Sequence, residues 1–170
     1  YENHGDTNWK VNFVIVNAQT YTFDITPTAD GLVSVNINQG VAQDFAGNDN
    51  VAATQYSITY DGTSPDVIIS SLVSDPTNAN PIPITITFSE EVVGFIEGDI
   101  LVTNGGVNLG SLSTLDNIIF TANIIPTADG LVSVDILGNV AQDLAGNLNN
   151  PAIPLFNVEY DGTSPAITNF

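Results

Sequence analysis

The chain has 170 residues, 43% of them hydrophobic, with no cysteine, and nineteen Asp and Glu residues against a single basic one give a formal charge of −18. One basic side chain, Lys10, cannot neutralise a run of phosphates, which excludes nucleic acids and anionic lipids as partners. The missing cysteines exclude disulfides and thiolate metal sites, and no apolar stretch approaches the roughly 18 residues of a membrane helix.

Between residues 62 and 161, apolar and polar residues alternate with the period of a β-strand, and no segment has the period and length of a helix. In chain order the predicted strands are Val67–Ser71, Ile82–Phe88, Ile100–Thr103, a short edge strand Val107–Leu112, Ile118–Ile124, Val132–Ile136 and Phe156–Tyr160. Six or seven antiparallel strands in about 100 residues predict an all-β, immunoglobulin-like sandwich. We expect Phe95 and Phe120 in its core, with Tyr60 and Tyr160 at strand ends.

The sequence repeats itself at a spacing of about 100 residues. Three segments return almost unchanged: Pro27–Val35 as Pro126–Val134, Val41–Asn48 as Val140–Asn147, and Tyr60–Pro65 as Tyr160–Pro165. Such a period is the signature of a tandem array. We therefore expect one complete repeat at 62–161, the C-terminal part of another at 1–61, the start of a third at 162–170, and a longer protein around them.

Several motifs of the second copy resemble the bacterial Ig-like repeats found along giant bacterial surface adhesins. They are Phe88–Phe95, Gly98–Ile100, Pro126–Gly130, Ala141–Asn147 and Asp161–Pro165. The resemblance implies tandem immunoglobulin-like antiparallel β-sandwiches, export to the cell surface, a stalk or spacer role in adhesion, and calcium at the junctions between repeats. Tyr1–Phe13 has no match in the second copy.

Acidic residues are predicted to gather at the end of the sandwich where the chain enters. If consecutive strands alternate in direction, the loops 89–98 and 138–150 return to that end, where the linker 61–66 also lies. The candidate metal ligands there are Asp61, Asp66, Glu90, Glu91, Asp99, Asp143 and Asn147, and Asp30, Asp44 and Asp161 are candidates beside the same or neighbouring junctions.

Crowded carboxylates need a counter-ion, because two of them about 4 Å apart repel by about 4 kcal/mol at an effective dielectric constant of 20. The complete repeat has neither Lys nor Arg, and the one histidine, His4, lies outside it. Ca²⁺ fits this composition because it takes six to eight oxygen ligands in flexible geometry. We hypothesise that Ca²⁺ bridges Asp61 or Asp66 with Glu90, Asp99 and Asp143 and locks neighbouring repeats into a rod.

Ordinary turn chemistry is the alternative for the same acidic residues. The carboxylate of Asp143 can cap a turn, and Asp30 and Asp129, each followed by glycine, are first of all turn residues. Asp49 and Glu97 are expected to be solvated.

Catalysis is not expected. Glu90 with Glu91 or Asp99 resembles a glycosidase pair only in charge, and a hydrolase triad would need a histidine that the complete repeat lacks. The predicted function is a structural spacer of a secreted, cell-surface adhesin, whose partners are neighbouring repeats and whose glycan or protein target is bound by another domain. The alternatives are an Ig-like module that binds carbohydrate or protein itself, and a repeat of a surface layer or filament.

Overall fold

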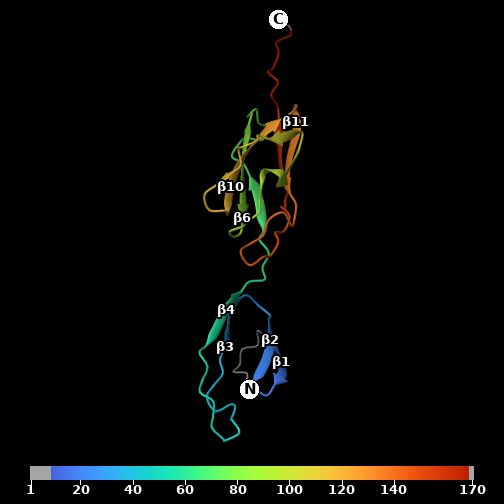
Figure 1. Ribbon diagram of the computed structural model, residues 1–170. Coiled ribbons are helices and arrows are strands. Elements are labelled where there is room, and N and C mark those ends of the chain that lie inside the picture. The colour runs from blue at the N-terminus through green and yellow to red at the C-terminus, as the bar shows by residue number, and fades with distance from the viewer. Residues whose placement is uncertain (1–8, 169–170) are drawn as a thin grey trace. The chain divides into compact units, whose positions relative to one another are not determined.

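The computed structural model describes residues 9–168, which divide into two compact units, the first ending at Thr63 and the second beginning at Ser64 (Figure 1). His4 and the last two residues of the predicted third copy, Asn169 and Phe170, lie outside the described residues. Within residues 9–168 no helix is long and apolar enough to cross a membrane. The predicted repeat boundaries stay predictions.

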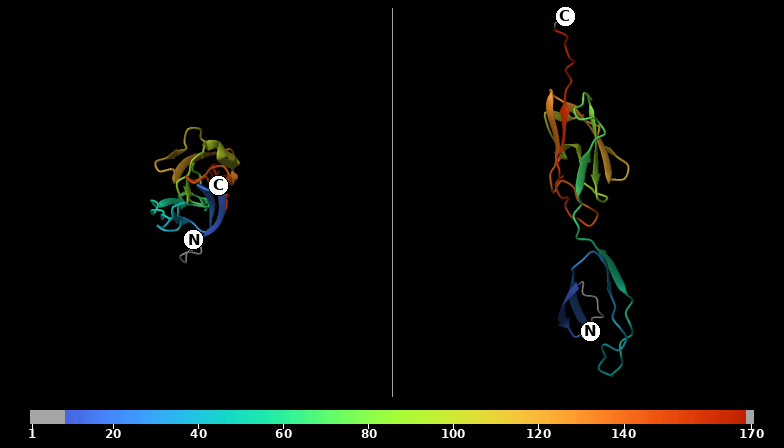
Figure 2. Two further views of the ribbon diagram at one scale, coloured as in Figure 1. Left: turned by 60° about the horizontal axis from the view of Figure 1, so that its bottom comes forward. Right: turned by 180° about the vertical axis from the view of Figure 1, so that it is seen from behind.

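The second unit consists of two antiparallel sheets. One has the order β5 (Val67–Ser70), β6 (Ile82–Phe88), β10 (Ile119–Pro126), β8 (Gly105–Val107), with β9 (Ser113–Thr114) also paired to β10. The other has the order β12 (Phe156–Tyr160), β11 (Gly130–Ile136), β7 (Ile100–Thr103), and a single 3₁₀ turn, η1 (Glu97–Asp99), precedes β7. Figure 2 shows this unit from behind. The prediction of an all-β antiparallel fold is confirmed.

The core of the second unit lies between these sheets because alternate side chains of β6 and β11 point inward. Ile82, Ile84, Ile86 and Phe88 are buried from one sheet, and Val132, Val134 and Ile136 are buried from the other. Phe88, Phe95 and Phe120 pack edge to face, with ring centroids 5.2–5.8 Å apart. The core positions expected for Phe95 and Phe120 are confirmed.

The predicted edge strand Val107–Leu112 is wrong in its extent. The chain instead forms the two short strands β8 and β9, separated by a turn in which the Ser111 N–H donates to the Asn108 carbonyl at 3.0 Å. Gly110 has φ +80° within this turn, a conformation that cannot continue an extended strand. Both short strands pair antiparallel with β10, so the turn interrupts this edge without reversing it.

The described part of the first unit contains two strand pairs. β1 (Trp9–Asn17) pairs with β2 (Thr20–Pro27), and β3 (Gly31–Val35) pairs with β4 (Tyr56–Tyr60), all antiparallel. The pairing of Gly31 with Tyr60 matches that of Gly130 with Tyr160 in β11 and β12. Tyr160 packs against the core as expected, whereas Tyr60 is 39% exposed, so its predicted core position is wrong here.

Candidate metal site

Asp143 organises a tight turn in the loop between β11 and β12. Its carboxylate accepts the backbone N–H of Gly146 at 2.6 Å, the backbone N–H of Asn147 at 2.8 Å and the side-chain amide of Asn147 at 2.8 Å. Gly146 has φ +98°, which only glycine adopts without strain.

The first unit contains the same turn, formed by Asp44 in place of Asp143, and so allows turn capping and metal binding to be compared. Asp44 accepts the N–H groups of Ala46 and Asn48 at 2.8 and 2.9 Å and the Asn48 side-chain amide at 2.9 Å. Asp44 is exposed, whereas Asp143 is only 1% exposed. The turn therefore forms in both settings, which supports the turn-capping interpretation for both residues, and what distinguishes Asp143 is burial.

A second polar residue, Asn149, holds the rest of this loop. Its side-chain oxygen accepts the N–H groups of Val140 and Ala141 at 2.9 and 2.8 Å, and its amide donates to the Leu137 carbonyl at 3.0 Å. Asn149 is 2% exposed. Sequence reasoning missed it, although the repeated copy carries the matching Asn50, which makes the equivalent bonds.

Glu90 reaches Asp143 because two loops pair with one another. The loop after β6 and the loop after β11 form an antiparallel bridge, in which Val93 and Gln142 exchange backbone hydrogen bonds of 2.8 and 3.1 Å. Glu90 is half-buried in the first of these loops. The bridge places a carboxylate oxygen of Glu90 within 4.8 Å of one of Asp143.

Asp143 carries its negative charge at neutral pH. Burial raises the pKa of its carboxyl, but the hydrogen bonds from the Asn147 side chain and from the backbone N–H groups of Asn147, Gly146 and Ala145 outweigh burial and lower the pKa below its ordinary value. No Lys, Arg or His follows Lys10 in the chain. Glu90 and Asp143 therefore have no cationic side chain in the second unit to neutralise them.

The other predicted ligands of the second unit occupy local roles. Asp66 accepts the Asn150 side-chain amide at 2.8 Å. Asp99 accepts the Ile96 N–H at 2.8 Å and so caps η1. Glu91 is exposed and accepts the Asn117 side-chain amide at 3.4 Å. Among the described residues these three carboxylates do not join the group that contains Glu90 and Asp143.

Asp30 and its repeat equivalent Asp129 hold the segment by which the chain leaves each unit. Asp30 accepts the Gly62 N–H at 2.6 Å and the Thr63 hydroxyl. Asp129 makes the same two bonds to Gly162 and Thr163, and Asp161 accepts the Thr163 N–H at 3.0 Å. The threonine hydroxyl is the chief cause of a lowered pKa at Asp30 and at Asp129.

The expectation that Glu97 is merely solvated is wrong. Its half-buried carboxylate accepts the N–H groups of Leu112 at 2.9 Å and Gly110 at 3.1 Å, and these bonds lower its pKa. Glu97 thus fixes the turn between β8 and β9. The sequence around Glu97 gave no signal for this contact, because Gly110 and Leu112 are 13 and 15 residues further along the chain. Asp49, also expected to be solvated, accepts the Gln43 amide at 2.8 Å.

A family model described as a bacterial Ig-like domain matches residues 61–160, more than half of the chain. The chain belongs to the bacterial Ig-like domain family. Comparison with curated proteins and with solved structures found no match. Domains of this family are typically non-enzymatic, extracellular modules of surface proteins.

Asp61, at which the family match begins, lies in the first unit and accepts the Thr63 N–H at 3.0 Å. Within the second unit, one carboxylate oxygen of Glu90 lies within 4.8 Å of one of Asp143. Oxygen ligands of Ca²⁺ lie at about 2.3–2.6 Å, so two of them on one ion are at most about 5 Å apart. The spacing and the all-oxygen donor set fit a single Ca²⁺ ion.

Proposed function

We propose that this bacterial Ig-like domain is a spacer module of a surface adhesin, and that Ca²⁺ held by Asp61, Glu90 and Asp143 stiffens the segment through which the chain enters the domain. The observation that carries the proposal is the approach of the Glu90 and Asp143 carboxylates to within 4.8 Å in a unit without Lys, Arg or His, and Asp61 is the further ligand that the sequence predicts. Two further features support it: burial of Asp143 limits screening by water, and its lowered pKa keeps it ionised.

The ion would act by joining three chain segments. Asp61 precedes the linker, Glu90 lies in the loop after β6, and Asp143 lies in the loop after β11. Bound Ca²⁺ would supply positive charge and further coordination positions for backbone carbonyls or water. Without it, the mutual repulsion of the carboxylates favours their separation.

The affinity expected of such a site suits the outside of a cell. Extracellular modules bind Ca²⁺ with dissociation constants of about 10⁻⁴ to 10⁻³ M. At free Ca²⁺ ten times the dissociation constant, binding stabilises the folded state by about 1.4 kcal/mol, and at a hundred times by about 2.7 kcal/mol. A calcium-dependent rise in melting temperature is therefore the expected signature.

The test is thermal unfolding of the whole chain in calcium and in chelator. The wild-type chain should melt at a higher temperature in calcium, and Asp143→Ala and Glu90→Gln should abolish the difference. Asp44→Ala is the matched control, because it removes the same turn cap from a residue outside the carboxylate group. Glu91→Gln is the control for Glu90. An equal calcium response in Asp143→Ala and the wild-type chain would refute the ligand assignment.

Small-angle scattering tests the stiffening role separately. In calcium the distribution of interatomic distances should be narrow, and chelator should broaden it for the wild-type chain. Asp61→Ala should scatter in calcium as the wild-type chain does in chelator. A distribution unaffected by calcium in a chain that demonstrably binds the ion would mean that Ca²⁺ stabilises the domain without stiffening its linker.

A binding role for the domain itself is less well supported. Three of its aromatic side chains, Phe88, Phe95 and Phe120, are buried against one another, so they offer no platform for a sugar ring.

A further inference from the structure

Asn104 is the one asparagine of the chain that is followed directly by glycine. It lies between β7 and β8 and has φ +56°, a left-handed conformation that asparagine adopts more readily than most residues with a side chain. An asparagine before glycine is also open to attack on its side chain by the next backbone nitrogen, because glycine carries no Cβ that obstructs the approach. The pair Asn104–Gly105 is therefore chemically labile.

The fold requires both residues of this pair. The side-chain amide of Asn104 donates to the Ala128 carbonyl at 2.9 Å, and the Asn104 carbonyl accepts the Thr127 N–H at 3.1 Å. A Cβ at position 105 would lie 2.8 Å from the Ile125 carbonyl oxygen, so glycine is needed there. Replacement of either residue costs a contact, and the labile pair is thus part of the fold itself.

The backbone N–H of Gly105 lies outside the hydrogen-bond ladder between β8 and β10. In this antiparallel pairing Thr127 donates to Asn104 and Asn108 donates to Asn123, so hydrogen bonds to β10 recur at every second residue from Asn104. The N–H of Gly105 therefore points away from β10, and β8 is the last strand on this path through the sheet. Attack by the Gly105 nitrogen breaks no hydrogen bond of this ladder.

We propose that Asn104 is a deamidation site, and that its reaction loosens the segment by which the chain leaves the second unit. The Gly105 nitrogen forms a bond to Cγ of Asn104 and gives up its proton, and the Cγ–Nδ2 bond breaks to release ammonia. Water then opens the resulting succinimide ring at either carbonyl carbon, which leaves aspartate or isoaspartate at position 104. The reaction consumes water and releases ammonia, and it needs no oxidant or other reactant.

The new carboxylate acts on the turn that carries Asp129. The Ala128 carbonyl loses its donor and faces a negative charge instead, and the second unit has no Lys, Arg or His to neutralise that charge. Asp129, the next residue, accepts the Gly162 N–H at 2.6 Å and the Thr163 hydroxyl. Movement of the turn therefore weakens the hold on the departing chain, and none of the proposed calcium ligands takes part.

Two other asparagines of the second unit are matched controls for the chemistry. Asn117 and Asn139 have φ +54° and +66°, close to the value at Asn104. They are followed by Ile118 and Val140, whose branched side chains are stiff and obstruct the attack. Reaction is therefore expected at Asn104 and not at these two positions.

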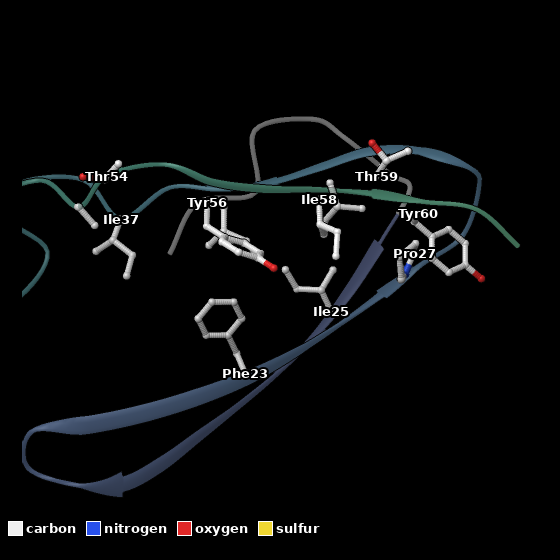
Figure 3. A pocket seen from close by; sticks show the side chains of 12 residues that line it. Phe23, Ile25, Pro27, Ile37, Thr54, Tyr56, Ile58, Thr59 and Tyr60 are labelled. Atoms are coloured by element: carbon white, nitrogen blue, oxygen red, sulfur yellow. The ribbon is translucent and has the colours of Figure 1, made fainter. Parts of the chain in front are cut away.

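The first unit provides a control for the structural effect. There Asp30 accepts the Gly62 N–H at 2.6 Å, directly beyond β4, which ends at Tyr60 (Figure 3). Residues 9–63 contain no asparagine followed by glycine. Deamidation should therefore leave the hold on Gly62 unchanged.

The experiment incubates the full 170-residue chain at neutral pH and physiological temperature and follows each asparagine by peptide mapping with mass spectrometry. A synthetic peptide of residues 100–108 is the unstructured reference. Asn104 should react at a rate within about tenfold of the peptide, because opening a turn beside an edge strand costs little free energy, while Asn117 and Asn139 stay intact. In the same samples, NMR-detected exchange of the Gly162 N–H should accelerate as Asn104 reacts, and exchange of the Gly62 N–H should stay constant.

Two variants separate the chemistry from its effect. Asn104→Asp supplies one product directly and should show accelerated Gly162 exchange from the start. Asn104→Gly accepts the left-handed conformation but cannot react, so its Gly162 exchange should stay constant throughout the incubation. An Asn104 that stays intact while the peptide reacts to completion would overturn the proposal. So would complete reaction at Asn104 with Gly162 exchange unchanged, because the site would then have no influence on the departing chain.

Discussion

The carboxylate of Asp129 accepts a hydrogen bond from the backbone N–H of Gly162 at 2.6 Å, 33 residues further along the chain. Asp30 makes the matching bond to Gly62, also at 2.6 Å. The two most conspicuous repeated motifs, the one around Asp129 and the one around Gly162, therefore recur together because they bind one another. This contact ties the departing chain to the domain it leaves and involves neither Glu90 nor Asp143.

Replacing Asp129 should release this departing segment locally. In Asp129→Ala the Gly162 N–H loses its acceptor, so its hydrogen exchange should accelerate while the exchange of the Gly62 N–H stays unchanged. Asp30→Ala is the reciprocal control and should affect Gly62 alone. NMR-detected exchange of the two amides makes the measurement, and an unaltered Gly162 rate in Asp129→Ala would contradict the role given to this carboxylate.

Removing Phe88 should destabilise the second unit strongly. Its ring is 1% exposed and lies against both Phe95 and Phe120, so Phe88→Ala leaves a cavity and should lower the free energy of unfolding by about 3–5 kcal/mol. Phe45→Ala removes an equally large but fully exposed ring and should change stability by less than about 0.5 kcal/mol. Urea denaturation of both variants checks the contrast, and equal losses would contradict the assignment of the core.

The glycine of the Asp143 turn should not tolerate a side chain. Gly146 has φ +98° and open space around it, so Gly146→Ala suffers backbone strain alone, which should cost about 1–2 kcal/mol. Gly106 is equally unobstructed and has no positive φ, so Gly106→Ala should be neutral or slightly stabilising. Denaturation midpoints measure both. A stable Gly146→Ala variant would show that the turn has another conformation.

Acid should weaken the fold. Hydrogen bonds from the backbone N–H groups of Ile119 and Ile118 lower the pKa of Asp116, and the pKa values of Glu97 and Asp143 are also below their ordinary values. A carboxyl with a lowered folded-state pKa binds protons more readily when unfolded, so its contribution is fully present above the unfolded value of about 4 and is lost as the pH falls through the folded value.

The matching measurement is the urea midpoint between pH 7 and pH 3 in chelator. The midpoint should hold until about pH 5 and fall below pH 4. Asp116→Asn should be less stable at neutral pH and should lose less on acidification than the wild-type chain, because one of the carboxyls responsible is gone. A midpoint that rises from pH 4 to pH 3 would contradict the sign of the argument.

Local patterning predicted most of the strands of the second unit. The alternation in Ile82–Phe88 requires one buried and one exposed face, and Ile82, Ile84, Ile86 and Phe88 are the buried set. The order of strands in the sheets did not follow, because the pairing of β7 with β11 depends on contacts about 30 residues apart that no local period records. The exposure of Tyr60 in the first unit was not foreseen either, since the same alternation describes a covered and an uncovered face equally.

The position of the candidate site was predictable from the sequence, but the orientation of its side chains was not. Topology alone places the loops of Glu90 and Asp143 at one end, and the Val93–Gln142 bridge brings them together there. Topology does not determine the direction in which each side chain points. Asp99, for example, accepts a hydrogen bond from the nearby backbone N–H of Ile96. Glu97 and Asn149 were missed because their partners are backbone N–H groups, which carry no residue-type signal.

An ion bound by Asp61, Glu90 and Asp143 would be seen most directly in an anomalous-difference map from crystals grown in about 10 mM calcium, well above the expected dissociation constant. We expect a peak between these three residues, with carboxylate oxygens about 2.3–2.6 Å away. A map without a peak there, with Glu90 and Asp61 turned outward into solvent, would contradict this expectation.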